Sequence, residues 1–319
     1  MDLGDRIIYY LGKLTQMMHP VLSPFEAKML LKYARSEIVG YPPIFIIGAP
    51  RTGSTILYQT ITKYCDVSYI SNFDCYFFKD ILIGVRLSKE LFKYSVHDSL
   101  SSKYGATKGL KSPCEAGALW YRWFPSDRHF VNDSDLEENQ LMEMKEVING
   151  VIRIKGRPII FKNMNCGQRL QVLAKVFPDA LFIYITRDPL YTAQSILMVR
   201  EQIFGNRKAW WSIMPKEYDQ LLSLSPTEQV VAQIYFIQKQ IEHDLNNLFP
   251  DSYYHLEYEK LCQYPANIIE EIRKYAAKRG VPIEIRDNYN VDHFIPNNRQ
   301  NIDDNTFRDL KIMVNKYFG

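Results

Sequence analysis

The stretch that decides the fold is Ile44-Phe45-Ile46-Ile47-Gly48-Ala49-Pro50-Arg51-Thr52-Gly53-Ser54-Thr55. Its first four residues are apolar and mostly β-branched, which predicts a short buried strand. A turn rich in glycine and proline follows, and apolar residues then recur at helical spacing from Ile56 onward. A strand that turns directly into a helix presents free backbone N–H groups at the positive end of the helix dipole. We therefore expect an anion-binding site at this turn.

The glycine spacing of the turn is that of a phosphate loop, because four residues separate Gly48 from Gly53 and Ser54 and Thr55 follow. A loop that binds nucleoside triphosphates carries Lys at the position of Ser54. Here the fixed charge in the turn is that of Arg51. The pattern favours a phosphate-like ligand outside ordinary triphosphate chemistry, with a glycine-rich turn that binds nothing as the alternative.

A second strand-to-helix turn is predicted where the apolar strand 181–186 runs into Arg187-Asp188-Pro189. Asp at the N-cap and Pro at the first helical position form a strong helix start, and the helix carries Ser195. Ligands of parallel α/β sheets bind beyond the carboxyl ends of the strands. We therefore expect Arg51 and Arg187 to flank one elongated ligand with two anionic ends, with a surface salt bridge as the alternative for Arg187.

Strands and helices alternate throughout the chain, with further strands predicted at 67–70, 158–163 and 253–258. This order predicts an α/β fold with three layers, in which a mostly parallel central sheet is flanked by helices and carries a phosphate-loop-like nucleotide site. The sequence has no internal repeat and no low-complexity linker, which favours a single domain over residues 1–319. Residues 1–40 are expected to form a helical cap, in pieces separated at its prolines.

Composition excludes several classes of protein. The chain has 319 residues and a net charge of +3 without blocks of like charge, so nothing indicates a dedicated nucleic-acid binder. Its five cysteines are scattered and lack a C-x-x-C pair, which favours reduced thiols, a cytoplasmic location and no zinc site. No segment has the length and character of a signal peptide or a membrane span, so we expect no membrane anchor in this chain.

Two further regions contain candidate site residues. A helix predicted over 115–124 places Trp120, Trp123 and Phe124 on one face, either as a core stripe or as an aromatic wall with Glu115 pointing into a cleft. Lys162 follows an apolar strand and is either a second site cation or a surface residue. The sequence shows no carboxylate pair suited to Mg²⁺.

With both turns in place, the sequence resembles the sulfotransferases that use 3′-phosphoadenosine 5′-phosphosulfate (PAPS). The stretch from Pro50 to Thr55 is similar to the loop that holds the 5′-phosphosulfate. Arg187-Asp188-Pro189, with Ser195 eight residues after Arg187, has the spacing of the family's 3′-phosphate site. Stretches such as Tyr104-Gly105-Ala106-Thr107 resemble a bacterial-type branch that acts on carbohydrates, including surface polysaccharides. The resemblance covers residues 44–262 and leaves 263–319 as C-terminal helices.

The resemblance implies a role for each matched residue. Backbone N–H groups of 52–55 and the hydroxyls of Ser54 and Thr55 would hold the 5′-phosphate, so the nucleotide-binding set includes Thr52, Gly53, Ser54 and Thr55. Arg51, where many cytosolic relatives have Lys, would stabilise the leaving oxygen. Arg187 and Ser195 would clamp the 3′-phosphate, and Arg299 in the C-terminal tail is a further candidate for binding the nucleotide.

The resemblance also implies a base that takes the acceptor proton, for which Glu115 is the first candidate and His129 the second. Lys162 is a candidate second cation near the sulfuryl group. The expected reaction moves a sulfuryl group from PAPS to a hydroxyl of a carbohydrate or glycolipid and leaves adenosine 3′,5′-bisphosphate, without a metal. A non-catalytic relative that binds nucleotide or glycan is the main alternative, and an atypical phosphate-loop kinase is the second.

Overall fold

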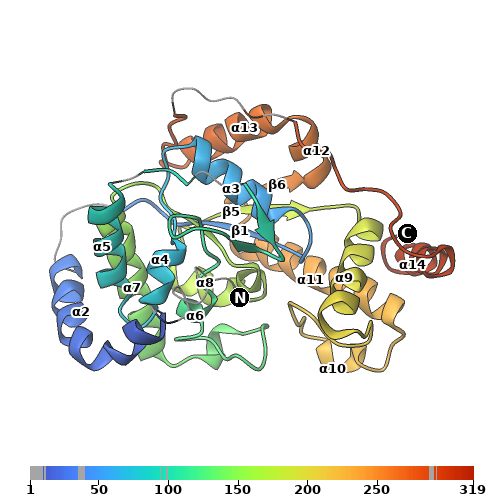
Figure 1. Cartoon of the computed structure of the whole chain (residues 1–319), viewed down its shortest axis with the longest axis horizontal. Helices are drawn as coiled ribbons and strands as arrows, with labels where there is room; N and C mark the ends of the chain where they lie inside the picture. Colours follow the sequence, from blue (N-terminus) through green and yellow to red (C-terminus); the bar gives the residue numbers. More distant parts are fainter. Residues whose placement is uncertain are drawn as a thin grey trace.

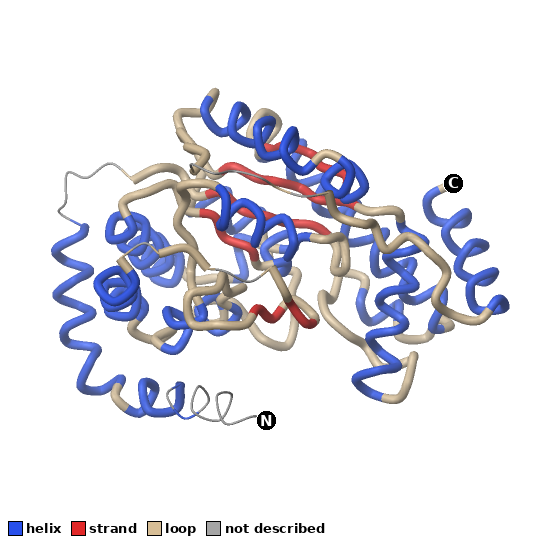
Figure 2. Tube along the Cα trace, turned by 45° about the horizontal axis from the view of Figure 1, so that its top comes forward, coloured by secondary structure: helices blue, strands red, loops and turns tan. Residues whose placement is uncertain are grey.

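The computed structural model describes residues 10, 12–34, 40–93, 95–97, 100–286, 291 and 293–319. A four-stranded sheet crosses the molecule between layers of helices (Figures 1 and 2). Its strands lie in the order β4 (Ile160–Lys162), β1 (Ile44–Gly48), β5 (Leu181–Thr186) and β6 (Tyr253–Glu257). All three pairings are parallel, so the carboxyl ends of the four strands share one edge of the sheet. The predicted α/β fold with a parallel central sheet is confirmed.

Strand β1 is buried along its whole length because both of its faces pack on helices. Ile44 and Ile46 belong to one hydrophobic core, and Phe45 and Ile47 belong to the other. This alternation is the two-residue period of a strand, with both sides apolar as parallel sheets require. The helices packed on the first face are α3 (Ser54–Tyr64), α12 (Tyr258–Gln263) and α13 (Pro265–Ala277), seen above the sheet in Figure 1.

The second face carries a thicker layer. Its helices are α7 (Glu138–Lys155), α8 (Leu170–Val176), α9 (Pro189–Phe204) and α11 (Pro226–Leu248). Three peripheral helices pack on this layer: α2 (His19–Ala34), α5 (Ile81–Phe92) and α14 (Asp304–Phe318). The short elements are α4 (Asn72–Tyr76), α6 (Gly117–Trp120), α10 (Tyr218–Leu221), β2 (Ser102–Lys103), β3 (Ala106–Thr107) and the 3₁₀ helices Asp133–Asp135 and Met164–Gln168. Within the described ranges, none of the helices combines the length and apolar character that crossing a bilayer requires.

Two predicted elements are corrected by the structure. Residues 67–70 are not a strand, because Ser68 makes only a single parallel bridge, to Ile159 beside β4. The helix predicted over 115–124 is limited to α6, because Ala116 has a positive φ of 53° that breaks the helical path. Glu115 therefore precedes this helix and does not lie in its first turn.

Residues 12–17 are helical, a turn lies at Met18, and α2 begins at His19. Pro20 lies in the first turn of α2, where a backbone N–H has no helical partner, and Pro24 lies inside the helix, where it costs one intrahelical hydrogen bond. The helical segment is therefore divided just before Pro20, and the expected break at Pro24 is wrong. The parts of the predicted cap at residues 1–9, 11 and 35–39 lie outside the described residues.

Candidate active site

The turn between β1 and α3 is held in an unusual backbone conformation. Arg51 has a φ of 69° and Gly53, the N-cap of α3, a φ of 85°. A β-carbon on Gly53 would lie 2.2 Å from Cδ2 of Tyr258, so only glycine fits this position. Thr52 is fully buried, and its hydroxyl donates a 2.9 Å hydrogen bond to the carbonyl of Ala49. Thr52 thus fastens the turn, and the first N–H groups of α3 remain available to a ligand.

The turn between β5 and α9 has the predicted cap. The Asp188 carboxylate accepts a 2.8 Å hydrogen bond from the N–H of Leu190, and Pro189 is the first residue of α9. The Arg187 guanidinium donates to the carbonyl of Asn297 at 2.7 Å and to the side-chain oxygen of Asn298 at 2.9 Å. Its central carbon lies 4.8 Å from the ring centroid of Tyr258. The C-terminal tail and Tyr258, the first residue of α12, thus hold Arg187 in place.

The two turns are in direct contact. Nη1 of Arg187 donates to the backbone carbonyl of Arg51 at 3.1 Å, and Nε of Arg51 donates to the hydroxyl of Ser195 at 2.9 Å. Burial and then the positive charge of Arg187 lower the pKa of Arg51. Among the described residues, no carboxylate forms an ion pair with either guanidinium. Two neighbouring cations without counter-charges make an electrostatic site for an anion.

Both guanidiniums line one cavity of about 350 Å³. The β2–β3 hairpin contributes Tyr104 and Gly105 to the wall, and the segment before α10 contributes Trp211. The other predicted site residues that line it are Gly53, Ser54, Thr55, Glu115, Lys162 and Ser195. The fold therefore brings eight of the predicted residues, counting Arg51 and Arg187, to one hollow at the carboxyl edge of the sheet.

Lys162 and Glu115 form an ion pair inside this cavity. Lys162 is 3% exposed, and its ammonium also donates to the hydroxyl of Thr55 at 3.0 Å. The Glu115 side chain is 38% exposed, and Asn163 donates to its backbone carbonyl at 3.1 Å. A β-carbon on Gly105 would lie 2.6 Å from Oε1 of Glu115, so the hairpin approaches this carboxylate closely. A cation and a carboxylate are thus placed beside the phosphate-loop-like turn.

His129, the second candidate for the base, does not line the cavity. It is 9% exposed, and its Nδ1 accepts a 2.9 Å hydrogen bond from the N–H of Met214. Burial and then the charge of Arg169 lower the pKa of His129 to about 4, so the ring is neutral near pH 7. Because Nδ1 is an acceptor, Nε2 carries the proton and faces the Tyr121 oxygen at 3.2 Å.

Arg299 also lies apart from the cavity lining. Its side chain is exposed, and its backbone carbonyl accepts a 2.9 Å hydrogen bond from Gln194 of α9. The residue therefore ties the tail to α9 through its main chain. The tail contacts the site through the two preceding residues, Asn297 and Asn298.

The tryptophans divide between the core and the cavity. Trp120 and Trp123 are 0% and 2% exposed and belong to the core on the second face of the sheet. The core-stripe interpretation of this pattern is confirmed, and an aromatic wall made by these two residues is wrong. Trp210 lies against Arg200, with the guanidinium carbon 5.1 Å from its ring, so Trp211 is the tryptophan that reaches the cavity.

Sequence reasoning missed Tyr258 and the Asn297–Asn298 pair, and it noted Tyr104 and Gly105 only as part of a family resemblance, without a role in the site. Tyr258 was detectable, because it is the last residue of the strand predicted over 253–258 and so lies at the same edge of a parallel sheet as Arg187. The tail and the hairpin reach the site from segments outside the sheet, and no local pattern indicates such contacts.

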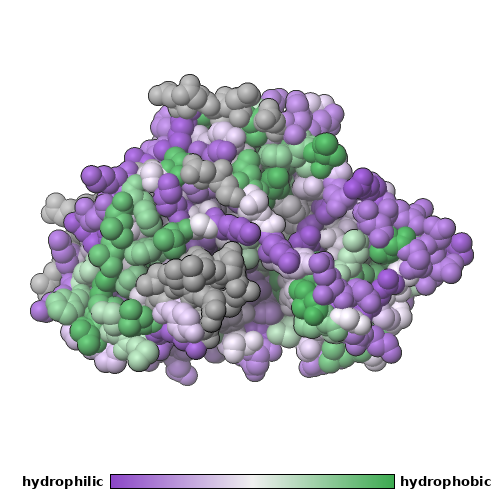
Figure 3. Space-filling model, in the orientation of Figure 1, coloured by the Kyte–Doolittle hydropathy of each residue, from purple (hydrophilic) through white to green (hydrophobic). Residues whose placement is uncertain are grey.

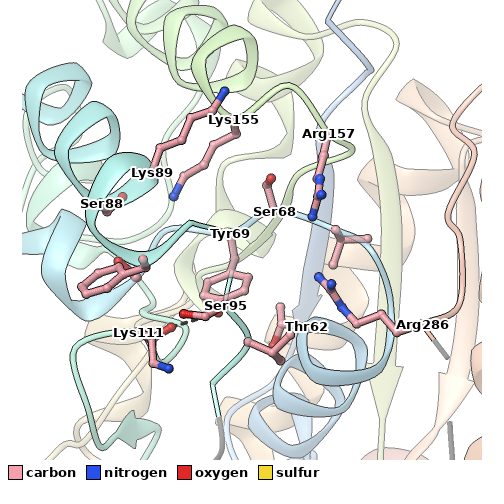
Figure 4. A pocket seen from close by; sticks show the side chains of 14 residues that line it. Thr62, Ser68, Tyr69, Ser88, Lys89, Ser95, Lys111, Lys155, Arg157 and Arg286 are labelled. Carbon is pink, nitrogen blue, oxygen red and sulfur yellow. Dashed lines mark hydrogen bonds between the residues drawn. The ribbon is translucent and has the colours of Figure 1, made fainter. Parts of the chain in front are cut away.

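A second, smaller pocket of about 60 Å³ lies at the other end of α3, beside Thr62 (Figure 4). Four of its five cationic side chains, all except Lys111, are engaged with the protein itself. Arg157 and Arg286 both pair with Asp66, and Lys155 pairs with Asp74. Lys89 donates to the carbonyl of Ile154 at the end of α7. These contacts join α5, α7 and the chain after α3, which gives the pocket a structural role.

Comparisons with known proteins agree with this geometry. The sequence model of the sulfotransferase family matches residues 42–277. An omega-hydroxy-beta-dihydromenaquinone-9 sulfotransferase, Stf3, from Mycobacterium bovis is 21% identical over 276 residues, covering 81% of this chain and 69% of the relative. The same protein of Mycobacterium tuberculosis matches with the same figures.

The fold is also similar to that of a solved structure. The crystal structure of sulfotransferase STF9 from Mycobacterium avium superposes with a TM-score of 0.50 at 13% identity, over 90% of this chain and 71% of that one. At this identity the likeness supports the fold alone. The family match spans both turns and all four strands of the central sheet, and the chain accordingly belongs to the sulfotransferase family and is a sulfotransferase.

Proposed function

We propose that this enzyme transfers the sulfuryl group of PAPS to an acceptor hydroxyl and releases a sulfate ester and adenosine 3′,5′-bisphosphate. The observation that carries the proposal is that the Arg51 and Arg187 guanidiniums line one cavity, with the Arg187 guanidinium hydrogen-bonded to the backbone carbonyl of Arg51. A ligand with a phosphate at each end neutralises both cations, which a ligand with one anionic end does not.

At the first turn, the N–H groups at the start of α3 and the hydroxyls of Ser54 and Thr55 bind the 5′-phosphosulfate. At the second turn, Arg187 and Ser195 bind the 3′-phosphate. Arg51 lies between them, because it is bonded to Ser195 yet belongs to the first turn. We propose that residues 1–319 act as one domain in this function.

The transfer is an in-line displacement at sulfur. The acceptor oxygen forms a bond to sulfur, and the bond from sulfur to the bridging oxygen of the phosphosulfate breaks, with its electron pair leaving on the nucleotide. Arg51 stabilises the negative charge that develops on this oxygen. Lys162, held beside Thr55, offsets charge on the transferring group, and the Glu115 carboxylate accepts the acceptor proton. Positioning and charge stabilisation supply most of the catalysis, as in phosphoryl transfer.

For the acceptor we propose a hydroxyl on a carbohydrate or glycolipid, with Trp211 as the cavity aromatic that a sugar ring would contact. A hydroxylated isoprenoid quinone is the second class, because the mycobacterial relative is named for the sulfation of one. The two classes share a free hydroxyl and differ in whether it is carried by a sugar or by an apolar chain.

The test is transfer of labelled sulfuryl from PAPS to a panel of sugars, glycolipids and hydroxylated quinones, with identification of the ester by mass spectrometry. Adenosine 3′,5′-bisphosphate should also raise the melting temperature of the protein in proportion to its concentration. Stabilisation by ATP-Mg²⁺ but not by the bisphosphate would indicate a kinase. Tight binding of the bisphosphate without transfer to any hydroxyl would indicate a non-catalytic relative.

A further inference from the structure

The outer face of α2 carries large apolar side chains that are open to solvent. Met17, before the helix, is 77% exposed, and Val21, Phe25 and Leu31 are each at least 58% exposed. On the neighbouring helix α5, Leu91 is 63% exposed. Figure 3 shows hydrophobic surface over α2 and α5 on the face in view. A cluster of large apolar side chains on a solvent-exposed face indicates an interaction surface, whereas single exposed apolar residues are ordinary.

The inner face of α2 is firmly attached, which explains why the outer face is open. The Glu26 carboxylate is buried and accepts hydrogen bonds from the N–H groups of Leu82 and Ile83 at 3.0 and 3.1 Å, at the start of α5. Leu30 and Tyr33 pack against the core beneath. The helix is therefore fixed by one face and presents the opposite face outward.

The charges of the outer face have one sign. Val21, Phe25, Lys28 and Lys32 follow one another at helical spacing, and the Lys28 ammonium lies 5.9 Å from the centroid of the Phe25 ring. Glu26 is the acidic residue between 10 and 34, and it is buried. The exposed face of this segment thus combines apolar groups with lysines and carries no carboxylate.

We propose that the surface formed by Met17, Val21, Phe25, Lys28, Leu31 and Lys32 binds the surface of an anionic lipid bilayer. Apolar side chains enter the boundary between headgroups and acyl chains, and the lysines contact anionic headgroups. A second copy of this chain is a poorer partner, because a two-fold interface would bring the lysines of both copies together. The surface holds the enzyme at a membrane, and it stands independently of the donor and acceptor proposed above.

The experiment is flotation of the purified full chain with vesicles of phosphatidylcholine, with and without phosphatidylglycerol. The wild-type protein should float with the anionic vesicles, and binding should weaken as salt rises. Lys28→Gln/Lys32→Gln should lower the partition coefficient about thirtyfold, at the usual contribution of a lysine near an anionic surface. Val21→Ser/Phe25→Ser should lower it about tenfold through lost apolar burial.

Matched controls are available elsewhere on the surface. Lys239 and Lys311 are exposed lysines that also lie over aromatic rings, so Lys239→Gln/Lys311→Gln makes the same charge change away from α2. Ile203→Ser/Leu222→Ser removes exposed apolar groups from another face. Both controls should float like the wild type. The proposal is overturned if the wild type does not float with anionic vesicles or if the α2 variants float like the controls. It is also overturned if the only effect of the α2 substitutions is the loss of a dimer, measured by analytical ultracentrifugation.

Discussion

The two ends of the active-site cavity are built from the same kind of turn, yet they hold their arginines differently. Arg187 is bound by the carbonyl of Asn297, by the side chain of Asn298 and by the carbonyl of Arg51, and Asn298 is itself held by Glu259 at 2.7 Å. Arg51 has one side-chain hydrogen bond, to Ser195, on a backbone with positive φ. Arg187, whose guanidinium is held by several hydrogen bonds, is suited to binding a charge that is present throughout the reaction. Arg51, whose guanidinium keeps N–H donors without a partner among the described residues, is suited to stabilising charge that develops in the transition state. We therefore propose that the end with Arg51, Lys162 and Glu115 carries out the chemistry and that the end with Arg187 serves binding.

The largest effect is expected from Glu115→Gln, which removes the proposed proton acceptor and keeps the shape of the side chain. Turnover should fall by about 10²–10⁴, the usual contribution of a general base, while affinity for adenosine 3′,5′-bisphosphate stays unchanged. Single-turnover transfer and calorimetric titration measure the two. Glu143→Gln, a change to an acid of α7 paired with Arg122, is the control and should behave as wild type. Undiminished transfer by Glu115→Gln would place the base elsewhere.

Arg51→Ala should lower turnover by about 10²–10³ at saturating donor, the loss typical of one preorganised charge-stabilising donor. Arg51→Lys keeps the charge without the planar fork and should recover part of the rate. Steady-state kinetics across donor concentrations separate the effect on turnover from that on KM. If Arg51→Ala raised only KM, the two ends of the cavity would not differ in role.

Arg187→Ala should weaken binding of adenosine 3′,5′-bisphosphate by about 10–100-fold, because it removes charge-assisted hydrogen bonds to one phosphate. Turnover at saturating donor should change little. Adenosine 5′-phosphosulfate, which lacks the 3′-phosphate, provides the control, since its affinity should be the same in wild type and variant. A variant that lost affinity for both ligands equally would show that Arg187 shapes the whole cavity.

The smallest effect on activity is expected from His129→Asn, because His129 lies outside the cavity lining. Turnover near pH 7 should stay within about threefold of wild type if His129 is not the base. The unfolded histidine binds a proton near pH 6.5, and the folded one only near pH 4. In wild type the free energy of unfolding therefore falls as pH drops through this window, and the variant should lack this contribution.

Urea unfolding measured between pH 4 and pH 7 tests the stability part of this prediction, and initial rates test the activity part. A large loss of turnover in His129→Asn, with unchanged folding, would indicate that His129 acts as the general base. Tyr121→Phe removes the hydroxyl that faces Nε2 and serves as a probe of the same contact.

The sheet strands show how far local patterns reach. Strands 44–48, 181–186 and 253–257 were predictable because apolar runs bounded by turns have few alternatives in a parallel sheet. The segment 67–70 was also predicted as a strand, but it contains the polar Ser68 and forms only one isolated bridge, from Ser68 to Ile159. Trp120 and Trp123 show a further limit of local patterns, because helical spacing alone could not distinguish a core stripe from a cavity wall.

What the sequence by itself determined is the pair of strand-to-helix turns and the residues Arg51, Arg187 and Ser195 that these turns carry. These features follow from the apolar pattern of strands, the N-cap preferences of helices and the glycine spacing of anion-binding turns, each of which depends on only a few neighbouring residues. Tertiary structure alone decided that Glu115 pairs with Lys162, that Tyr258 and the Asn297–Asn298 tail brace Arg187, and that His129 is turned away from the cavity. Those contacts join segments separated by up to 111 positions along the chain, and long-range packing, which leaves no local pattern, selects them.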